Sequence, residues 1–138
     1  MSMENPSREE IRNILKKAKR IAVIGLSENP NKTSYMVSEA MQNAGYEIIP
    51  VNPEAKSPIL GVHPVRSLSE IDGHIDIVNV FRRSEFLLDA AKEFAEANAD
   101  VFWAQLGLYN EEAYQFLKEK GAVVIMDRCI KVEHAMTR

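Results

Sequence analysis

The chain has 138 residues, enough for one domain with a buried core that needs no disulfide or structural metal. Apolar residues make up 46% of the chain and charged residues 27%, which is typical of folded globular proteins and excludes the disordered and membrane classes. The net charge of -3 provides no basic excess and disfavours a nucleic-acid surface. We therefore expect one domain over residues 1–138 and no nucleic-acid partner.

The sequence also indicates where the protein is located. Its one cysteine, Cys129, excludes an intramolecular disulfide and a multi-cysteine zinc site, which fits a reducing compartment. The N-terminus is charged and lacks the apolar segment of a signal peptide, and no stretch approaches the ~18 apolar residues of a membrane span. We expect a cytoplasmic protein with no membrane partner.

The first elements are predicted from capping and apolar patterns. Ser7 and Glu10 form a capping-box pattern ahead of apolar residues at helical spacing, so a helix opens the chain. Residues 21–25 are a short apolar run, which indicates a strand buried on both faces. A second helix ends at Gly45 and is followed by a second strand over residues 46–51.

The second half continues the alternation. A looser connection over residues 54–73 leads to a third strand over residues 75–80. Ser84 is a candidate cap for the next helix, and a fourth strand is expected over residues 100–104. Asn110 then begins a further helix.

A fifth strand over residues 122–126 completes the pattern. Strands that alternate with helices and are apolar throughout predict a parallel sheet with helices on both faces, built from right-handed crossovers. We expect an α/β fold, a Rossmann-like doubly wound sheet of five strands in the order 3-2-1-4-5, with an extra N-terminal helix.

The loop after the first strand is the main candidate for ligand binding. Ligands of open α/β sheets bind outside the carboxyl ends of the strands, and this loop runs into a helix N-terminus, whose free amides favour phosphate. Lys32 adds a positive charge. The alternative is a polar turn in which Thr33 or Ser34 only caps the helix.

A nicotinamide cofactor fits the same loops less well. The second and third glycines of the G-x-G-x-x-G pattern are missing. The second strand ends in Asn52 and Pro53 where an acidic partner for the ribose is usual, although Glu54 is close. The residues alone therefore disfavour NAD without excluding it.

Six blocks, in this order along the chain, carry a resemblance to a known family: residues 21–27, 32–34, 51–53, 80–82, 103–107 and 127–134. Over nearly its full length the sequence resembles the small bacterial CoA-binding domain proteins, and it is similar to the CoA-binding domain of the succinyl-CoA synthetase α subunit. The resemblance implies coenzyme A, free or acylated, as the ligand. It places the diphosphate near the first loop, the adenine end near the loops after strands two and three, and the pantetheine along the loop after strand four.

The residues expected to bind the cofactor all lie at or after the carboxyl ends of strands. They are Gly25, Ser27, Asn29, Lys32, Thr33, Ser34, Asn52, Pro53, Phe81, Arg82, Arg83, Gln105, Leu106 and Gly107. Gly25 lets the backbone approach a ligand, and Arg82 or Arg83 can engage a phosphate bidentately. The alternatives are that Phe81 is a core residue, that Arg83 is a solvated side chain, and that Gly107 only caps a turn.

The sequence supplies no recognisable catalytic constellation. The phosphohistidine chemistry of the synthetase belongs to a separate domain, and the three histidines of this chain have no neighbouring nucleophile in a known pattern. Cys129 is expected to be a packing residue, although its reactivity cannot be deduced from sequence. We expect a CoA-binding protein that is not an enzyme.

Two other functions stay open at this point. One is an NAD(P)-binding oxidoreductase or nicotinamide sensor on the same fold. The other is an interaction subunit of an acyl-CoA enzyme, which leaves a homo-oligomer or a partner enzyme open. Fold analogy cannot choose among them, because one α/β scaffold hosts many functions.

Overall fold

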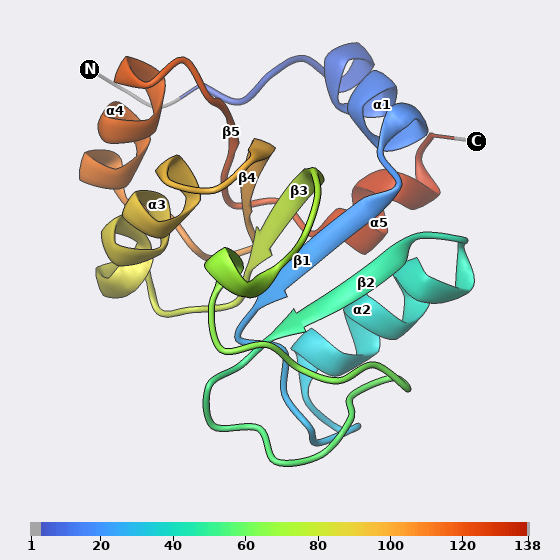
Figure 1. The fold of residues 1–138 in the computed structure, drawn as a ribbon. Coiled ribbons are helices and arrows are strands. Elements are labelled where there is room, and N and C mark those ends of the chain that lie inside the picture. Colours follow the sequence, from blue (N-terminus) through green and yellow to red (C-terminus); the bar gives the residue numbers. More distant parts are fainter. Residues whose placement is uncertain (1–3, 138) are drawn as a thin grey trace.

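A computed structural model describes residues 4–137 and contains one five-stranded parallel sheet (Figure 1). The strands are β1 (Arg20–Ile24), β2 (Glu47–Val51), β3 (Ile75–Val80), β4 (Ala99–Ala104) and β5 (Val123–Ile125). The α/β class and the Rossmann-like arrangement of five parallel strands are confirmed. The order in the sheet is β2-β1-β3-β4-β5, so the expected order 3-2-1-4-5 was wrong in placing β3 outside β2.

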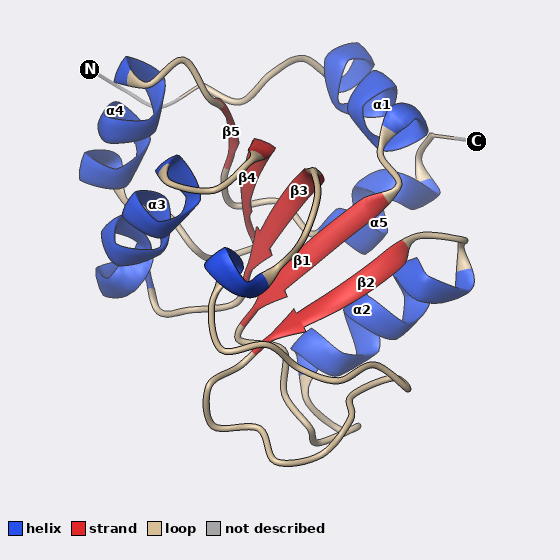
Figure 2. Ribbon diagram, viewed as in Figure 1, coloured by secondary structure: helices blue, strands red, loops and turns tan. Residues whose placement is uncertain are grey.

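Helices cover both faces of this sheet (Figure 2). They are α1 (Arg8–Lys17), α2 (Thr33–Asn43), α3 (Leu87–Ala95), α4 (Glu111–Glu119) and α5 (Ile130–Ala135), with short 3-10 turns η1 (Leu68–Glu70) and η2 (Ser84–Phe86). Buried residues of α3 and α4 share one apolar cluster with the sheet, and those of α1, α2 and α5 share the other. The fold is therefore doubly wound, with the sheet between two apolar layers.

The connection between β2 and β3 occupies the outer edge of β2, where the expected order had placed β3. Val65, in the connection between β2 and β3, donates its amide to the carbonyl of Pro50 at 2.9 Å and accepts the amide of Asn52 at 2.9 Å. Pro50 has no amide to offer on this side, which makes β2 suited to an edge position. The connection then packs Leu68 into the α3 and α4 layer and brings β3 against β1.

Two of the three predicted N-terminal helix caps are present in the structure. The capping box of Ser7 and Glu10 is confirmed, and so is Asn110, whose side chain accepts the amide of Ala113 at 2.8 Å. The cap at Ser84 was wrong: Ser84 begins η2, and its hydroxyl accepts the amide of Tyr109 at 3.0 Å. Helix α5, which follows β5, was not predicted.

The core has its largest side chains in β4, where Phe102 and Trp103 are fully buried on opposite faces. The indole nitrogen of Trp103 donates to the carbonyl of Arg128 at 2.9 Å, which satisfies the polar end of the ring. The loop after β5 is thereby held against β4. Within residues 4–137, the helices lack the length and apolarity needed to cross a membrane.

A pair of serines on α2 provides a test of this packing. Ser34 and Ser38 are both buried, but the hydroxyl of Ser34 accepts the amide of Ser27, whereas that of Ser38 has no hydrogen-bond partner among the described residues. We expect Ser38→Ala to raise the free energy of unfolding by about 1 kcal/mol, because it removes an unpaired buried hydroxyl, and Ser34→Ala to lower it by about 1 kcal/mol. Urea unfolding measures both, and equal losses in the two variants would contradict the assignment.

Candidate functional site

The carboxyl ends of β1 and β3 meet at Gly25 and Phe81. The amide of Phe81 donates to the carbonyl of Ile24 at 2.9 Å, and Gly25 has a φ of 85°. A Cβ atom on Gly25 would lie 2.3 Å from the carbonyl oxygen of Phe81. Glycine is therefore required here by both the backbone conformation and the close approach of β3.

The loop after β1 is organised by its own polar side chains. Ser34 Oγ accepts the amide of Ser27, and Ser27 Oγ accepts the amide of Asn29, both at 3.0 Å. Asn29 Oδ1 accepts the amide of Asn31 at 2.9 Å. Lys32, not Thr33 or Ser34, is the N-cap residue of α2. The two serines and Asn29 thus shape the loop that was expected to hold a phosphate.

The loop after β2 is tied to this first loop. Asn52 donates its side-chain amide to the carbonyl of Leu26 at 2.9 Å. The carboxylate of Glu28 accepts the amides of Lys56 at 2.9 Å and Ser57 at 2.8 Å. Sequence reasoning missed Glu28, because only the fold brings the two loops together; the signal it offered was an acidic residue inside a loop expected to face phosphate.

A cavity of about 440 Å³ opens at the carboxyl edge of the sheet. Its lining comes from the start of α2, the loops after β3 and β4, and the residue before α5: Thr33, Phe81, Arg82, Arg83, Gln105, Leu106, Leu108 and Cys129. Six of these are predicted site residues, whereas Leu108 and Cys129 were not included in the prediction. The cavity brings the loops after β3 and β4 together because β3 and β4 are neighbours in the sheet.

The other predicted residues are outside this lining as far as residues 4–137 show: Gly25, Ser27, Asn29, Lys32, Ser34, Asn52, Pro53 and Gly107. Most of them belong to the loops after β1 and β2. Asn52 and Pro53 are separated from the β3 loop by β1, which lies between β2 and β3. The structure therefore divides the predicted residues into a cavity group and a group in the loops after β1 and β2, with Gly107 in the loop after β4.

Two arginines give the cavity a positively charged rim. The guanidinium of Arg82 lies over the ring of Phe86, 5.5 Å from its centroid. The Arg83 side chain is 80% exposed, and its Nη1 lies 3.9 Å from a carboxylate oxygen of Glu85. An exposed pair at this distance contributes little to stability, so the Arg83 guanidinium is not tightly held by Glu85. Phe81 is half-buried, packs against the core and also lines the cavity.

The loop after β4 is fixed by contacts with the segment after β5. Gln105 is buried, and its Oε1 accepts the amide of Ile130 at 3.0 Å. Asp127 accepts the amide of Gly107 at 2.7 Å and donates its own amide to Leu108 at 3.1 Å. Cys129, half-buried beside this contact, lines the same cavity. One wall of the cavity therefore depends on residues far apart in the sequence.

Comparisons with known proteins show what this chain resembles. The family model described as the CoA binding domain matches residues 19–135. The uncharacterized protein YneT of Bacillus subtilis (strain 168) is 67% identical over 136 residues, which are 99% of this chain and 100% of that one.

Solved structures share the fold over almost the whole chain. The Thermus thermophilus protein called cell-free ID.343 has a TM-score of 0.92 and 33% identity, over 96% of this chain and 100% of that one. A hypothetical protein from Pyrococcus horikoshii OT3 has a TM-score of 0.91 and 29% identity, over 99% of each chain.

Replacing Gly25 tests the contact between β1 and β3. We expect Gly25→Ala to lower the free energy of unfolding by roughly 3 kcal/mol, because the methyl group adds a clash with Phe81 to the strain of a positive φ. Gly121→Ala is the matched control: its φ is 79°, but an added Cβ has open space, so a loss of about 1 kcal/mol is expected. Denaturant unfolding of both variants measures the difference, and similar losses would contradict the close approach.

Proposed function

The chain belongs to the family of CoA-binding domains, and from that premise we propose that it binds coenzyme A, free or acylated, at the carboxyl edge of its sheet without catalysing a reaction on it. The observation that supports this best is the cavity of about 440 Å³, whose rim carries Arg82 and Arg83. Coenzyme A combines a highly charged phosphate end with a long, weakly polar pantetheine arm. The cavity and the loop after β1 offer complementary surfaces to these two parts.

The charged part of the ligand fits the loop after β1. This loop leads into the N-terminus of α2, where unpaired amides and the helix dipole favour an anion. Lys32, the N-cap residue of that helix, is exposed and can pair with the diphosphate. Asn52 and Pro53, in the adjoining loop, would then border the adenosine, and Arg82 or Arg83 would take a further phosphate oxygen.

The pantetheine arm fits the cavity. Leu106 and Leu108 supply apolar surface, and the buried Gln105 supplies an amide that can hydrogen-bond to the arm. The part of the lining that the structure describes contains neither histidine nor carboxylate, the groups that most often move protons in catalysis. We therefore assign the cavity to recognition, with binding itself as the function.

One observation supports a role with a partner enzyme as a second candidate. Leu106, Phe86 and Tyr109, from the loops after β3 and β4, expose large apolar side chains, and Leu106 is 68% exposed. The two loops are linked by the hydrogen bond from Tyr109 to Ser84, and exposed apolar side chains on linked loops suit a surface that meets an acyl chain or another protein. In this second function the domain would present its coenzyme A to an enzyme made by another chain.

Calorimetric titration with coenzyme A tests the proposal. We expect one site per chain and about tenfold weaker binding by Lys32→Ala, because the variant loses one charge-assisted contact with phosphate. Lys118→Ala, which removes an exposed lysine from α4, is the matched control and should bind as the parent does.

Two results would count against the assignment. One is the absence of coenzyme A binding together with energy transfer from Trp103 to NADH, which would favour a nicotinamide cofactor. The other is unchanged affinity in Lys32→Ala, which would move the diphosphate away from the first loop.

The contact of Asp127 with the loop after β4 provides a further test of where the arm binds. Asp127→Ala removes the acceptor for the amide of Gly107, so we expect severalfold weaker binding of coenzyme A through loss of loop order. Asp127→Asn keeps a side-chain oxygen and tolerates the φ of 60° at this position, and it should restore most of the affinity. Equal losses in both variants, measured by calorimetry, would contradict a positioning role.

A further inference from the structure

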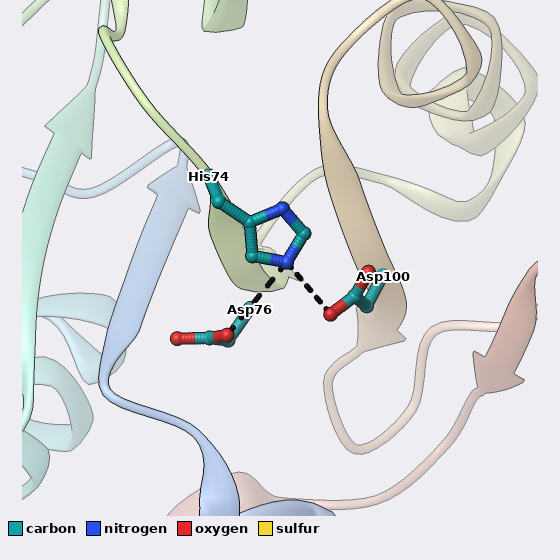
Figure 3. Close-up of side chains that lie close together, drawn as sticks. All are labelled: His74, Asp76 and Asp100. Carbon is teal, nitrogen blue, oxygen red and sulfur yellow. Dashed lines mark hydrogen bonds and ion pairs between the residues drawn. The ribbon is translucent and has the colours of Figure 1, made fainter.

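Three side chains converge at the amino edge of the sheet (Figure 3). The cavity lies at the opposite, carboxyl edge. His74 directly precedes β3, Asp76 lies in β3, and Asp100 lies in the neighbouring strand β4. Nε2 of His74 is 2.8 Å from Oδ2 of Asp100 and 3.8 Å from Oδ1 of Asp76. One ligand atom from each residue lies within 4.8 Å of the others. An imidazole nitrogen and two carboxylate oxygens therefore face one small volume.

Groups outside this trio hold two of its members in position. Nδ1 of His74 lies 3.0 Å from the side-chain oxygen of Asn98, and Nε2 lies 2.8 Å from Oδ2 of Asp100. Both partners are hydrogen-bond acceptors, so Nδ1–H can stay on Asn98, whereas the Nε2 proton that bonds to Asp100 must leave before the Nε2 lone pair can bind an ion. Oδ2 of Asp76 accepts the amides of Lys19 at 2.8 Å and Arg20 at 2.9 Å, which leaves Oδ1 on the side of His74. Such outer hydrogen bonds orient the ligands of metal sites in proteins.

We propose that His74, Asp76 and Asp100 bind a divalent transition-metal ion, with zinc as the best fit. Zinc accepts imidazole nitrogen and carboxylate oxygen at about 2.0–2.2 Å, so neighbouring ligand atoms of a tetrahedral ion lie about 3.3 Å apart. The separations of 2.8 and 3.8 Å bracket that value. Water completes the coordination. The ion joins the amino ends of β3 and β4 and, through the amides bound to Asp76, the start of β1.

The surrounding charges set the conditions for binding. Hydrogen bonds to Asp100 and then Asn98 raise the pKa of His74 against the opposing effect of burial, so protons compete with the ion. Burial favours a higher pKa for Asp76, but the amides of Arg20 and Lys19 and the nearby charges outweigh it and hold this pKa below its ordinary value. Asp76 is thus a ready anionic ligand.

Arg20 opposes the ion with its own positive charge. Its guanidinium donates to the carbonyls of Asp72 at 2.8 Å and His74 at 2.9 Å and lies 3.4 Å from the carboxylate of Glu47. These contacts also fix the backbone of His74. The side chains of His74 and Asp100 are 45% and 60% exposed, so an ion can reach them from solvent. We expect moderate affinity.

Titration of the metal-free protein at mildly alkaline pH tests the site, because fewer protons then compete with the ion for His74. Calorimetry with zinc chloride should give one ion per chain, and cobalt should give a visible spectrum typical of nitrogen and oxygen ligands. We expect His74→Gln and Asp100→Asn each to weaken binding at least tenfold. His63→Gln, which removes another exposed histidine, is the control and should bind as the parent does. Asp76 is left in place, because its carboxylate also holds the start of β1.

A second measurement separates site binding from general effects. Zinc should raise the Tm of the parent and of His63→Gln, and it should leave the Tm of His74→Gln and Asp100→Asn unchanged, because a ligand stabilises only the fold that binds it. Circular dichroism confirms that the variants are folded. Three outcomes would overturn the proposal: no binding by the parent at about 1 mM zinc, undiminished binding by His74→Gln, or a thiolate-to-cobalt absorption band, which would assign the ion to Cys129.

Discussion

The contact between Gly25 and Phe81 is the constraint on which the carboxyl edge of this sheet depends. The backbone of β3 approaches β1 so closely that a Cβ on Gly25 would lie 2.3 Å from the carbonyl oxygen of Phe81. This approach lets the amide of Phe81 bond to Ile24 and turns the chain from β1 into the loop that leads to α2. The loop after β1 and the loop after β3 both begin at this contact, so it fixes where each of them starts.

The strand order decides which loops share a site. With β3 between β1 and β4, the loop that carries Phe81 and Arg82 adjoins the loop that carries Gln105, and the two enclose one cavity with the start of α2. The outer edge of β2 is instead occupied by Val65. Hydrogen bonds of Asn52 and Glu28 join the loops after β1 and β2. These two loops form a second, polar surface at the carboxyl edge of the sheet.

The two ends of the sheet have different chemistry. The carboxyl edge combines the N-terminus of a helix, exposed cations and an apolar cavity, which suits a long anionic ligand with a weakly polar arm. The amino edge combines His74 with two carboxylates, which suits a cation. Strands β1, β3 and β4 run from one edge to the other and pair in parallel. This pairing fixes the position of the cavity residues relative to His74 and the two carboxylates.

The sequence by itself determined the features that depend on near neighbours. Five apolar strands, the caps at Ser7 and Asn110 and the polar loop after β1 were all predicted, because capping and apolar spacing act within a few residues. Only the tertiary structure decided the strand order, the role of Ser84, the placement of Cys129 and Phe81 in one cavity, and the contact of His74 with Asp100. The strand order depends on the path of the connection around Val65, and the other contacts depend on pairings between segments far apart in the sequence. Capping and apolar spacing act within a few residues, so they do not encode these long-range contacts.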